Sequence, residues 1–295
     1  MKYVLSVLFI FSILLLVSCQ QEPDDVILSP SPSGVDDSTF LAAVVELDTT
    51  YPLGLDTSGI SYFLYDSQKR LVQVRRLYYE PGAVGGTLDS YEKRFYTGND
   101  TLPYKLAHYM EDAPTNDEID TVFLTYQNGV IIKDSVLFYE GSQLSSTVIH
   151  RFKVLSGSRV SVTAHRRIPG QPDFYDSVIS HQTWINGNLA AQKDTTFASP
   201  YWGFNFSYQY DNNPNPLLRF ALTYPMTNYM HNIGDYSDFF ARLSINNETG
   251  WSEEYTGGQL NHVELSYQYR ADGYPLILRD KALGEPYKLL FIYQK

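Results

Sequence analysis

The chain has 295 residues, a formal net charge of −11 at pH 7 and a single cysteine. The negative charge argues against a nucleic-acid partner and against attachment to anionic lipid through basic patches, because both surfaces are themselves negative. One cysteine allows no disulfide within the chain and no cluster of thiolate metal ligands. The chain contains no G-x-S-x-G motif and no Gly-rich phosphate loop, so no motif marks a nucleophilic serine or a phosphate site, and we expect no cofactor.

The first eighteen residues have the arrangement of an export signal. Lys2 precedes an unbroken apolar run from Val7 to Val17, which is shorter than the about 20 residues that a membrane-spanning helix needs. The run ends in Leu16-Val17-Ser18-Cys19, which resembles the bacterial lipobox. The resemblance implies cleavage before Cys19 and acylation of that residue, and several acyl chains hold a protein durably on a membrane. The alternative is an ordinary secretory peptide in which the cysteine occurs by chance.

Residues 19–38 are predicted to form a disordered tether. They are rich in Pro, Ser, Gly and Asp, so they cannot bury enough apolar surface to fold. The acidic residues Glu22, Asp24 and Asp25 resemble a signal for display on the bacterial cell surface, although an ordinary acidic linker is equally consistent with them. We therefore expect a lipid-anchored protein of the outer membrane, on its periplasmic face or on the cell surface.

Residues 39–295 are predicted to form a single antiparallel β domain. Short apolar segments alternate with turn residues, and three turns carry pairs that accept the positive φ of a two-residue type I′ hairpin, namely Asn128-Gly129, Asn186-Gly187 and Asp272-Gly273. Aromatic residues alternate with small or polar ones from Trp202 to Tyr210, which places five aromatic side chains on one face of a strand. Only residues 102–110 and 226–240 leave room for short helices. We expect an all-β protein, an antiparallel meander of hairpins able to curl into an open barrel-like sheet.

Two segments near the C-terminus carry a family resemblance. Tyr208–Pro216 ends a strand in an Asn-Pro turn, and Tyr267–Pro275 contains an Asp-Gly-Tyr-Pro turn. Together with the lipobox they resemble uncharacterised Bacteroidota lipoproteins that are built from tyrosine-aspartate hairpin repeats. The resemblance covers the signal and roughly residues 200–295, and it implies a porin-like β fold with no established biochemical activity.

The candidate binding residues are the three tryptophans, Trp184, Trp202 and Trp251. Indole rings stack on the flat faces of sugars, although packing in the core of a sheet is the commoner use of an aromatic strand face.

Catalytic and metal sites have weaker support in the sequence. Asp173 and Asp176 are the best pair of carboxylates for glycoside hydrolysis, yet most surface aspartates only solvate a turn. The histidines His150, His165 and His181 recur about every fifteen residues but differ in strand phase, so the sequence does not indicate a metal site.

Two functions remain open. The first is a non-enzymatic structural or binding role at the envelope, with a glycan or a partner envelope protein as the ligand and with the membrane held through the lipid. The second is an exported hydrolase of glycan or peptide whose site is assembled from residues far apart in the sequence.

Overall fold

The computed structural model describes residues 40–48, 56–79, 86–110, 118–127, 130–156, 159–196, 203–216, 244–255, 258, 260–281 and 287–294. The predicted signal, the tether and Cys19 lie outside the described residues, as do Trp202 and residues 226–240. Every regular element that is described is a strand. Among the described residues, no helix is long and apolar enough to cross a membrane.

The described residues form sixteen strands. In chain order they are β1 (Phe40–Asp48), β2 (Asp56–Tyr65), β3 (Leu71–Tyr78), β4 (Thr87–Phe95), β5 (Lys105–Met110), β6 (Glu118–Gln127), β7 (Val130–Glu140), β8 (Gln143–Ser156), β9 (Arg159–Arg167), β10 (Phe174–Ile185), β11 (Asn188–Thr196), β12 (Gly203–Pro214), β13 (Asn246–Tyr255), β14 (Leu260–Tyr269), β15 (Pro275–Asp280) and β16 (Tyr287–Gln294).

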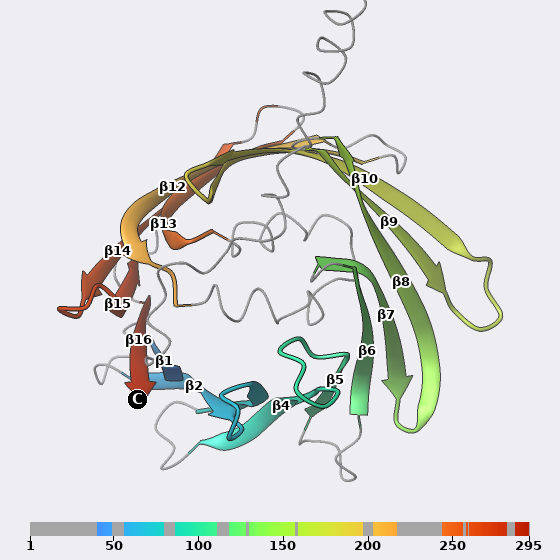
Figure 1. Ribbon diagram of the computed structural model, residues 1–295, viewed down its shortest axis with the longest axis horizontal. Helices are drawn as coiled ribbons and strands as arrows, with labels where there is room; N and C mark the ends of the chain where they lie inside the picture. The colour runs from blue at the N-terminus through green and yellow to red at the C-terminus, as the bar shows by residue number, and fades with distance from the viewer. Residues whose placement is uncertain are drawn as a thin grey trace, which may run out of the picture.

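The strands form one closed antiparallel barrel. Each strand pairs with its neighbours in sequence, and β1 pairs with β16 from Phe40↔Gln294 to Asp48↔Tyr287. Figure 1 shows the resulting ring, in which the blue first strand and the red last strand lie side by side. The all-β meander predicted from the sequence is confirmed, and the sheet is closed rather than open.

The turns explain where the strands reverse. Asn186 and Gly187 have φ values of 50° and 78°, as a two-residue type I′ turn between β10 and β11 requires. Asn128 and Gly129 lie outside the described residues, but β6 and β7 pair up to Gln127↔Val130, so the predicted hairpin is present. The Asp272–Gly273 turn is longer than the two residues predicted, because the last β14–β15 pair is Tyr269↔Pro275.

The helix predicted as one option for residues 102–110 is wrong. Lys105–Met110 is strand β5, paired with β4 on one side and β6 on the other. Alternation decides the outcome: Leu106 and His108 are buried on one face, while Lys105 and Tyr109 lie on the other. The neighbouring strands supply backbone partners that the local sequence does not reveal.

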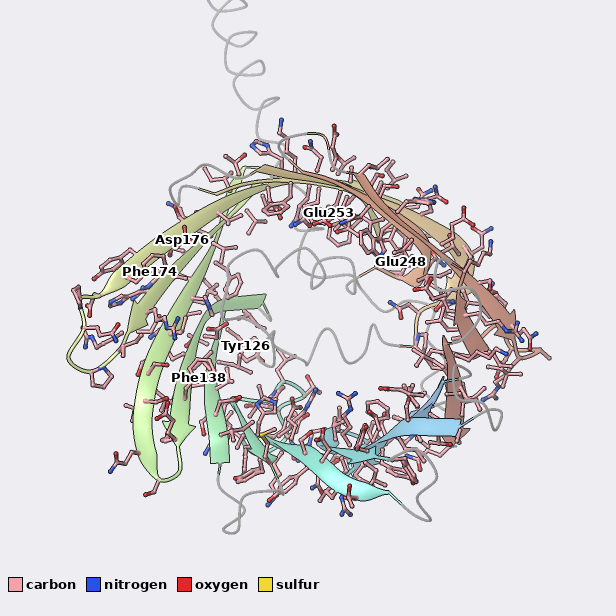
Figure 2. All side chains as sticks on the ribbon, turned by 180° about the vertical axis from the view of Figure 1, so that it is seen from behind. Tyr126, Phe138, Phe174, Asp176, Glu248 and Glu253 are labelled. Atoms are coloured by element: carbon pink, nitrogen blue, oxygen red, sulfur yellow. The ribbon has the colours of Figure 1, made fainter. Side chains whose placement is uncertain are left out.

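Directly paired residues share a face of the sheet, so the register divides the wall into an inner and an outer face. Apolar rows cross the inner face, for example Leu106↔Val122↔Val136↔Val148. These four side chains are buried and belong to one cluster. In Figure 2 the labelled Phe138, which pairs with Asp120 on this face, lies inside the ring.

A second cluster covers the inner face of β9 to β13. It contains Val162, Val178, Leu189, Phe206 and Tyr208. Phe204, Phe206 and Tyr208 stack along β12 with centroid separations of 6.2 and 6.1 Å. The one-sided aromatic face predicted for this strand is confirmed for residues 204–210, the part that is described.

The outer face of β11 to β14 is polar. One cross-strand row reads Lys193↔Asn205↔Glu254, and the next contains Ser207↔Ser252↔His262. A barrel that spans a membrane carries an apolar outward band, because charges there meet lipid. This arc of the wall has instead the composition of a surface in contact with water.

Candidate functional site

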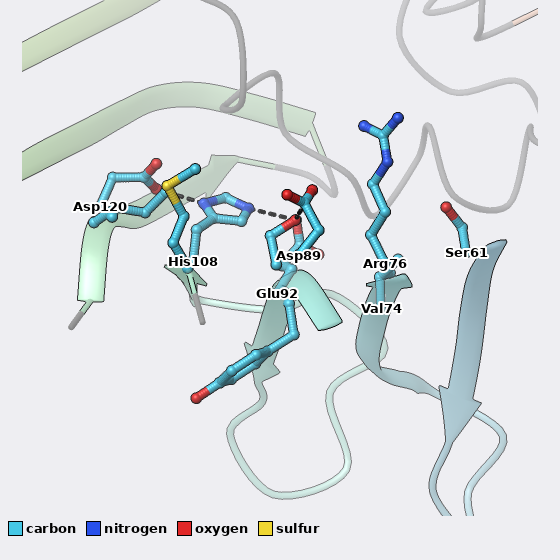
Figure 3. Close-up of a pocket in the computed structure, with 11 residues that line it drawn as sticks. Ser61, Val74, Arg76, Asp89, Glu92, His108 and Asp120 are labelled. Atoms are coloured by element: carbon cyan, nitrogen blue, oxygen red, sulfur yellow. Dashed lines mark hydrogen bonds and ion pairs between the residues drawn. The ribbon is translucent and has the colours of Figure 1, made fainter. Parts of the chain in front are cut away.

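A cavity of about 360 Å³ opens on the inner face where β2 to β6 meet. Its lining comes from consecutive strands: Ser61, Val74, Arg76, Asp89, Ser90, Tyr91, Glu92, His108, Met110, Ile119 and Asp120. Figure 3 shows Ser61, Arg76, Asp89 and His108 projecting to the same side of the sheet. The volume is at the small end of the ~300–1,000 Å³ that ligand pockets usually have.

A buried ionic network forms one side of the cavity. His108 on β5 sits between two carboxylates, with Nε2 at 2.7 Å from Glu92 Oε2 and Nδ1 at 2.5 Å from Asp120 Oδ1. Arg94 Nε donates to Glu92 Oε1 at 2.5 Å. The register explains the geometry, because Glu92 is directly opposite His108 and His108 directly opposite Asp120.

The network is charged and balanced at neutral pH. Burial by itself lowers the pKa of His108, but the hydrogen bonds to Asp120 and Glu92 outweigh burial and raise that pKa to about 9. Burial likewise raises the pKa of Glu92, yet the Arg94 guanidinium and His108 hold it below the usual value. Two cations therefore face two carboxylates, and both histidine nitrogens donate.

The other side of the cavity is accessible. The Arg76 side chain is 44% exposed and its Nη2 reaches Glu46 at 3.5 Å. Ser90 Oγ donates to Asp89 Oδ2 at 3.3 Å. Asp89 is the extra residue where the β3–β4 register shifts between Arg76 and Leu77, which turns its carboxylate toward the cavity. Hydroxyl, guanidinium and carboxylate groups thus surround the space together.

The polar inner face continues along β7 and β8. His150 Nδ1 is 2.7 Å from Asp134 Oδ1, and both residues are buried. His165 and His181 lie on the outer face, since their partners Tyr175 and Lys193 are outward residues. His150 therefore differs in strand phase from the other two histidines, as predicted, whereas His165 and His181 share the outer face. Among the described residues, no group of three or more His, Cys, Asp or Glu side chains is arranged to hold a metal ion.

Trp184 and Trp251 both lie on the inner face and pack against one cluster, although they are far apart in sequence. Both pack, partly buried, against the cluster that contains Phe206 and Tyr208. Trp184 Nε1 donates to Gln182 Oε1 at 3.1 Å. The structure thus brings two of the three predicted binding residues to one aromatic wall, while Trp202 lies outside the described residues.

A polar ladder borders this aromatic wall. Gln182 pairs with Gln192, and Ser180 with Asp194, across β10 and β11. Gln192 Nε2 donates to Asp194 Oδ2 at 2.6 Å, whereas Gln192 Oε1 and Asp194 Oδ1 have no hydrogen-bond partner. Burial raises the pKa of Asp194 to about 6, and the bonds from Ser180 and Gln192 offset only part of that rise.

The carboxylate pair suggested by the sequence does not form a site. Asp173 lies in an exposed turn, where His165 and Arg167 bind it at 2.9 and 3.3 Å. Asp176 is opposite Ala164 on the inner face of the barrel. The two carboxylates face different sides, so they cannot flank one sugar.

Sequence reasoning missed the network of Glu92, His108 and Asp120. These residues are 16 and 12 positions apart, and only the pairing of β4, β5 and β6 aligns them. The available signal was the alternation of inward and outward side chains within each strand, which places each of these three residues on the inner face. The register between strands decides which charged side chains are paired, and it cannot be inferred from the sequence of any single strand.

No protein-family profile and no curated protein matches this chain. Among solved structures, it is similar to a porin-like protein from Bacteroides uniformis, with a TM-score of 0.50 and 10% sequence identity. The match covers 86% of this chain and 96% of that protein. At this identity the likeness concerns the fold, and it agrees with the porin-like barrel that the family resemblance implied.

Proposed function

We propose that this chain is a lipid-anchored protein of the outer membrane that binds a hydroxyl-rich ligand, a glycan, on the inner face of its barrel. The cavity between β2 and β6 is the observation that carries the proposal. Its accessible groups include a guanidinium from Arg76, a carboxylate from Asp89 and hydroxyls from Ser61 and Ser90. Such donors and acceptors match the alternating hydroxyls of a sugar.

The ionisable groups support binding rather than catalysis. A general acid or base works best with a pKa near the operating pH. The pKa of His108 is raised to about 9 and that of Glu92 is lowered, so neither group exchanges its proton readily at pH 7. Their mutual hydrogen bonds hold the two side chains in place, which gives the cavity a rigid charged side.

The lipid anchor is supported by the sequence. The lipobox ends at Cys19, and the acidic, Pro- and Ser-rich tether leads directly to the first strand at Phe40. The polar outer arc of β11 to β14 favours a barrel held at the membrane rather than one surrounded by lipid. The periplasmic face and the cell surface are both compatible with this arrangement.

Glycan-array binding of the chain from Gln20 onward tests the proposal. We expect Arg76→Ala and Asp89→Asn to weaken the affinity for a retained glycan about tenfold each, since each removes a charge-assisted hydrogen bond. Arg75→Ala is the matched control, because Arg75 is the next residue on β3 and faces outward opposite Tyr62. A Trp251→Ala variant that alone loses binding would move the ligand to the aromatic wall.

Two results would count against the proposal. The first is silence of the wild-type chain on glycans, combined with capture of an envelope protein that survives Arg76→Ala. That outcome would favour a partner protein. The second is an unmodified thiol at Cys19 in the mature protein, which mass spectrometry of the N-terminus would reveal. Such a thiol would remove the anchor.

One contact keeps the hydrolase alternative open. Ser252 Oγ is 2.8 Å from His262 Nδ1, and His262 Nε2 is 3.5 Å from Glu264 Oε1. The group lies exposed on the outer face, and Lys281 Nζ also binds Glu264 at 3.2 Å. Ester or peptide hydrolysis that disappears in Ser252→Ala would favour this alternative, whereas unchanged activity in that variant would exclude this group.

A further inference from the structure

The outer face of strands β15, β16, β1, β2, β3 and β4 differs from the polar outer face of β11 to β14, and we call it the seam face. One unbroken apolar row crosses all six strands: Ile277↔Leu290↔Val45↔Ile60↔Leu77↔Leu88. The row beside it includes Ile292, Ala43 and Tyr62. Ile292 is 49% exposed and Tyr62 38% exposed. In Figure 1, β16, β1 and β2 lie together at the lower left of the ring.

The charges of the seam face have one sign. Its described outward positions hold Arg75, Lys93, Arg279 and Lys288, and none of these positions holds a carboxylate. Arg279 is directly opposite Lys288. Like charges directly opposite each other on a sheet destabilise it. An anion bound between them would reverse that cost.

The carboxylates of these strands lie on the inner face. Glu46 is opposite Gly59, Glu92 opposite Val74, and Asp280 opposite Leu265. The net charge of −11 therefore does not describe each face separately. In these strands the described carboxylates lie on the inner face, whereas the outer seam face is basic. The net charge predicts weak attraction to anionic lipid, but a membrane contacts one face of the barrel rather than the average.

We infer that the seam face docks on the anionic surface of the membrane that holds the lipid at Cys19. The inference rests on the lipid anchor of the proposed function. Phe40, the first residue of β1, is 21 positions after Cys19. The flexible tether proposed for residues 19–38 would span about 25 Å on average, which would keep the seam face, which contains β1, near the bilayer.

The chemistry of the seam face suits a lipid headgroup layer. Basic side chains beside an apolar strip contact phosphates while their stems and the strip enter the interface. Tyrosine prefers the same depth, because its ring is apolar and its hydroxyl is wet. Tyr62 and Tyr91, on either side of Arg75 in one cross-strand row, supply such rings.

Vesicle co-sedimentation of the unlipidated chain from Gln20 onward tests the inference. We expect binding to phosphatidylglycerol vesicles that weakens as salt rises, and little binding to phosphatidylcholine vesicles. Each cation near an anionic surface contributes about fivefold. Neutralising two, in Arg279→Gln with Lys288→Gln, should therefore weaken binding about thirtyfold.

The matched control exists on the opposite part of the wall. Lys133 and Arg151 are also directly opposite each other on the outer face, across β7 and β8. Lys133→Gln with Arg151→Gln removes the same charge, so we expect less than a threefold loss of vesicle binding. An equal loss in both double variants would show a general charge effect and would overturn the docking face.

Two further results separate the alternatives. A dimer in solution that Ile292→Asp dissociates would assign the seam face to a second copy of this chain, and would contradict membrane docking. Absence of glycan binding, with selective vesicle binding retained, would refute the proposed function but leave the docking role of the seam face intact. Absence of lipid on Cys19 would overturn both proposals. Retained glycan binding without selective binding to anionic vesicles would refute the docking of the seam face and leave the proposed function intact.

Discussion

The stability of the barrel should depend on the charge of His108. The pKa of this residue rises from its ordinary 6.5 to about 9 in the folded protein. A folded-state pKa above the unfolded value means that protonated His108 stabilises the fold. The contribution is complete below pH 6.5 and is lost as the pH rises through about 9. The shift of about 2.5 units corresponds to about 3 kcal/mol in the free energy of unfolding.

The perturbation is His108→Gln, which keeps a hydrogen-bonding side chain but removes the titrating group. At pH 6 the variant should unfold at a clearly lower urea concentration, because Glu92 and Asp120 then lack the cation between them. Between pH 6.5 and 9 the free energy of unfolding of the wild type should fall by about 3 kcal/mol, whereas that of the variant should stay nearly level.

Urea unfolding followed by tryptophan fluorescence at half-unit pH intervals measures this difference. His181→Gln is the control, since His181 is exposed on the outer face, and its curve should follow that of the wild type. A His108→Gln protein that loses stability over the same pH interval as the wild type would refute the reasoning. The titrating group would then have to be another residue.

Three further outcomes follow from other parts of the molecule. Asp194→Asn should raise the free energy of unfolding at pH 7 by up to about 3 kcal/mol and leave it unchanged below pH 3.8. The reason is that burial disfavours the charged form of Asp194, whose pKa is raised to about 6. Urea unfolding at both pH values checks this. Gly250→Ala should cost about 1–3 kcal/mol, since the new Cβ would stand 2.8 Å from the Val263 carbonyl oxygen; thermal unfolding against the parent measures this. Cys19→Ala should leave the signal uncleaved or the protein in the soluble fraction, which fractionation and mass spectrometry would show.

Local features of the fold could be predicted from the sequence. Asn186-Gly187 marks its hairpin because those two residues accept positive φ, and the β12 aromatic face follows from alternation alone. Both signals are contained within about ten residues. The misassigned window at residues 102–110 shows the limit, since a short apolar segment fits a strand or a helix until its neighbours are known.

Non-local features could not be predicted. The cavity needs Ser61, Arg76, Asp89 and His108 on four different strands, so its composition depends on three registers at once. The seam face depends on the pairing of β1 with β16, which joins residues more than two hundred positions apart. A sequence contains both sides of such a pair but not the contact between them.

The pairing of β1 with β16 also means that the barrel cannot close before the last strand is in place. Until the last strand arrives, the growing sheet has two open edges, and open edges are where strands of other chains add. The proposed anchor at Cys19 would keep one of those edges fixed in place, while the other moves with the newest hairpin. Closure requires the C-terminal strand to pair with β1. Truncation before Tyr287 should therefore yield open sheets that aggregate through their exposed edges, rather than a smaller barrel.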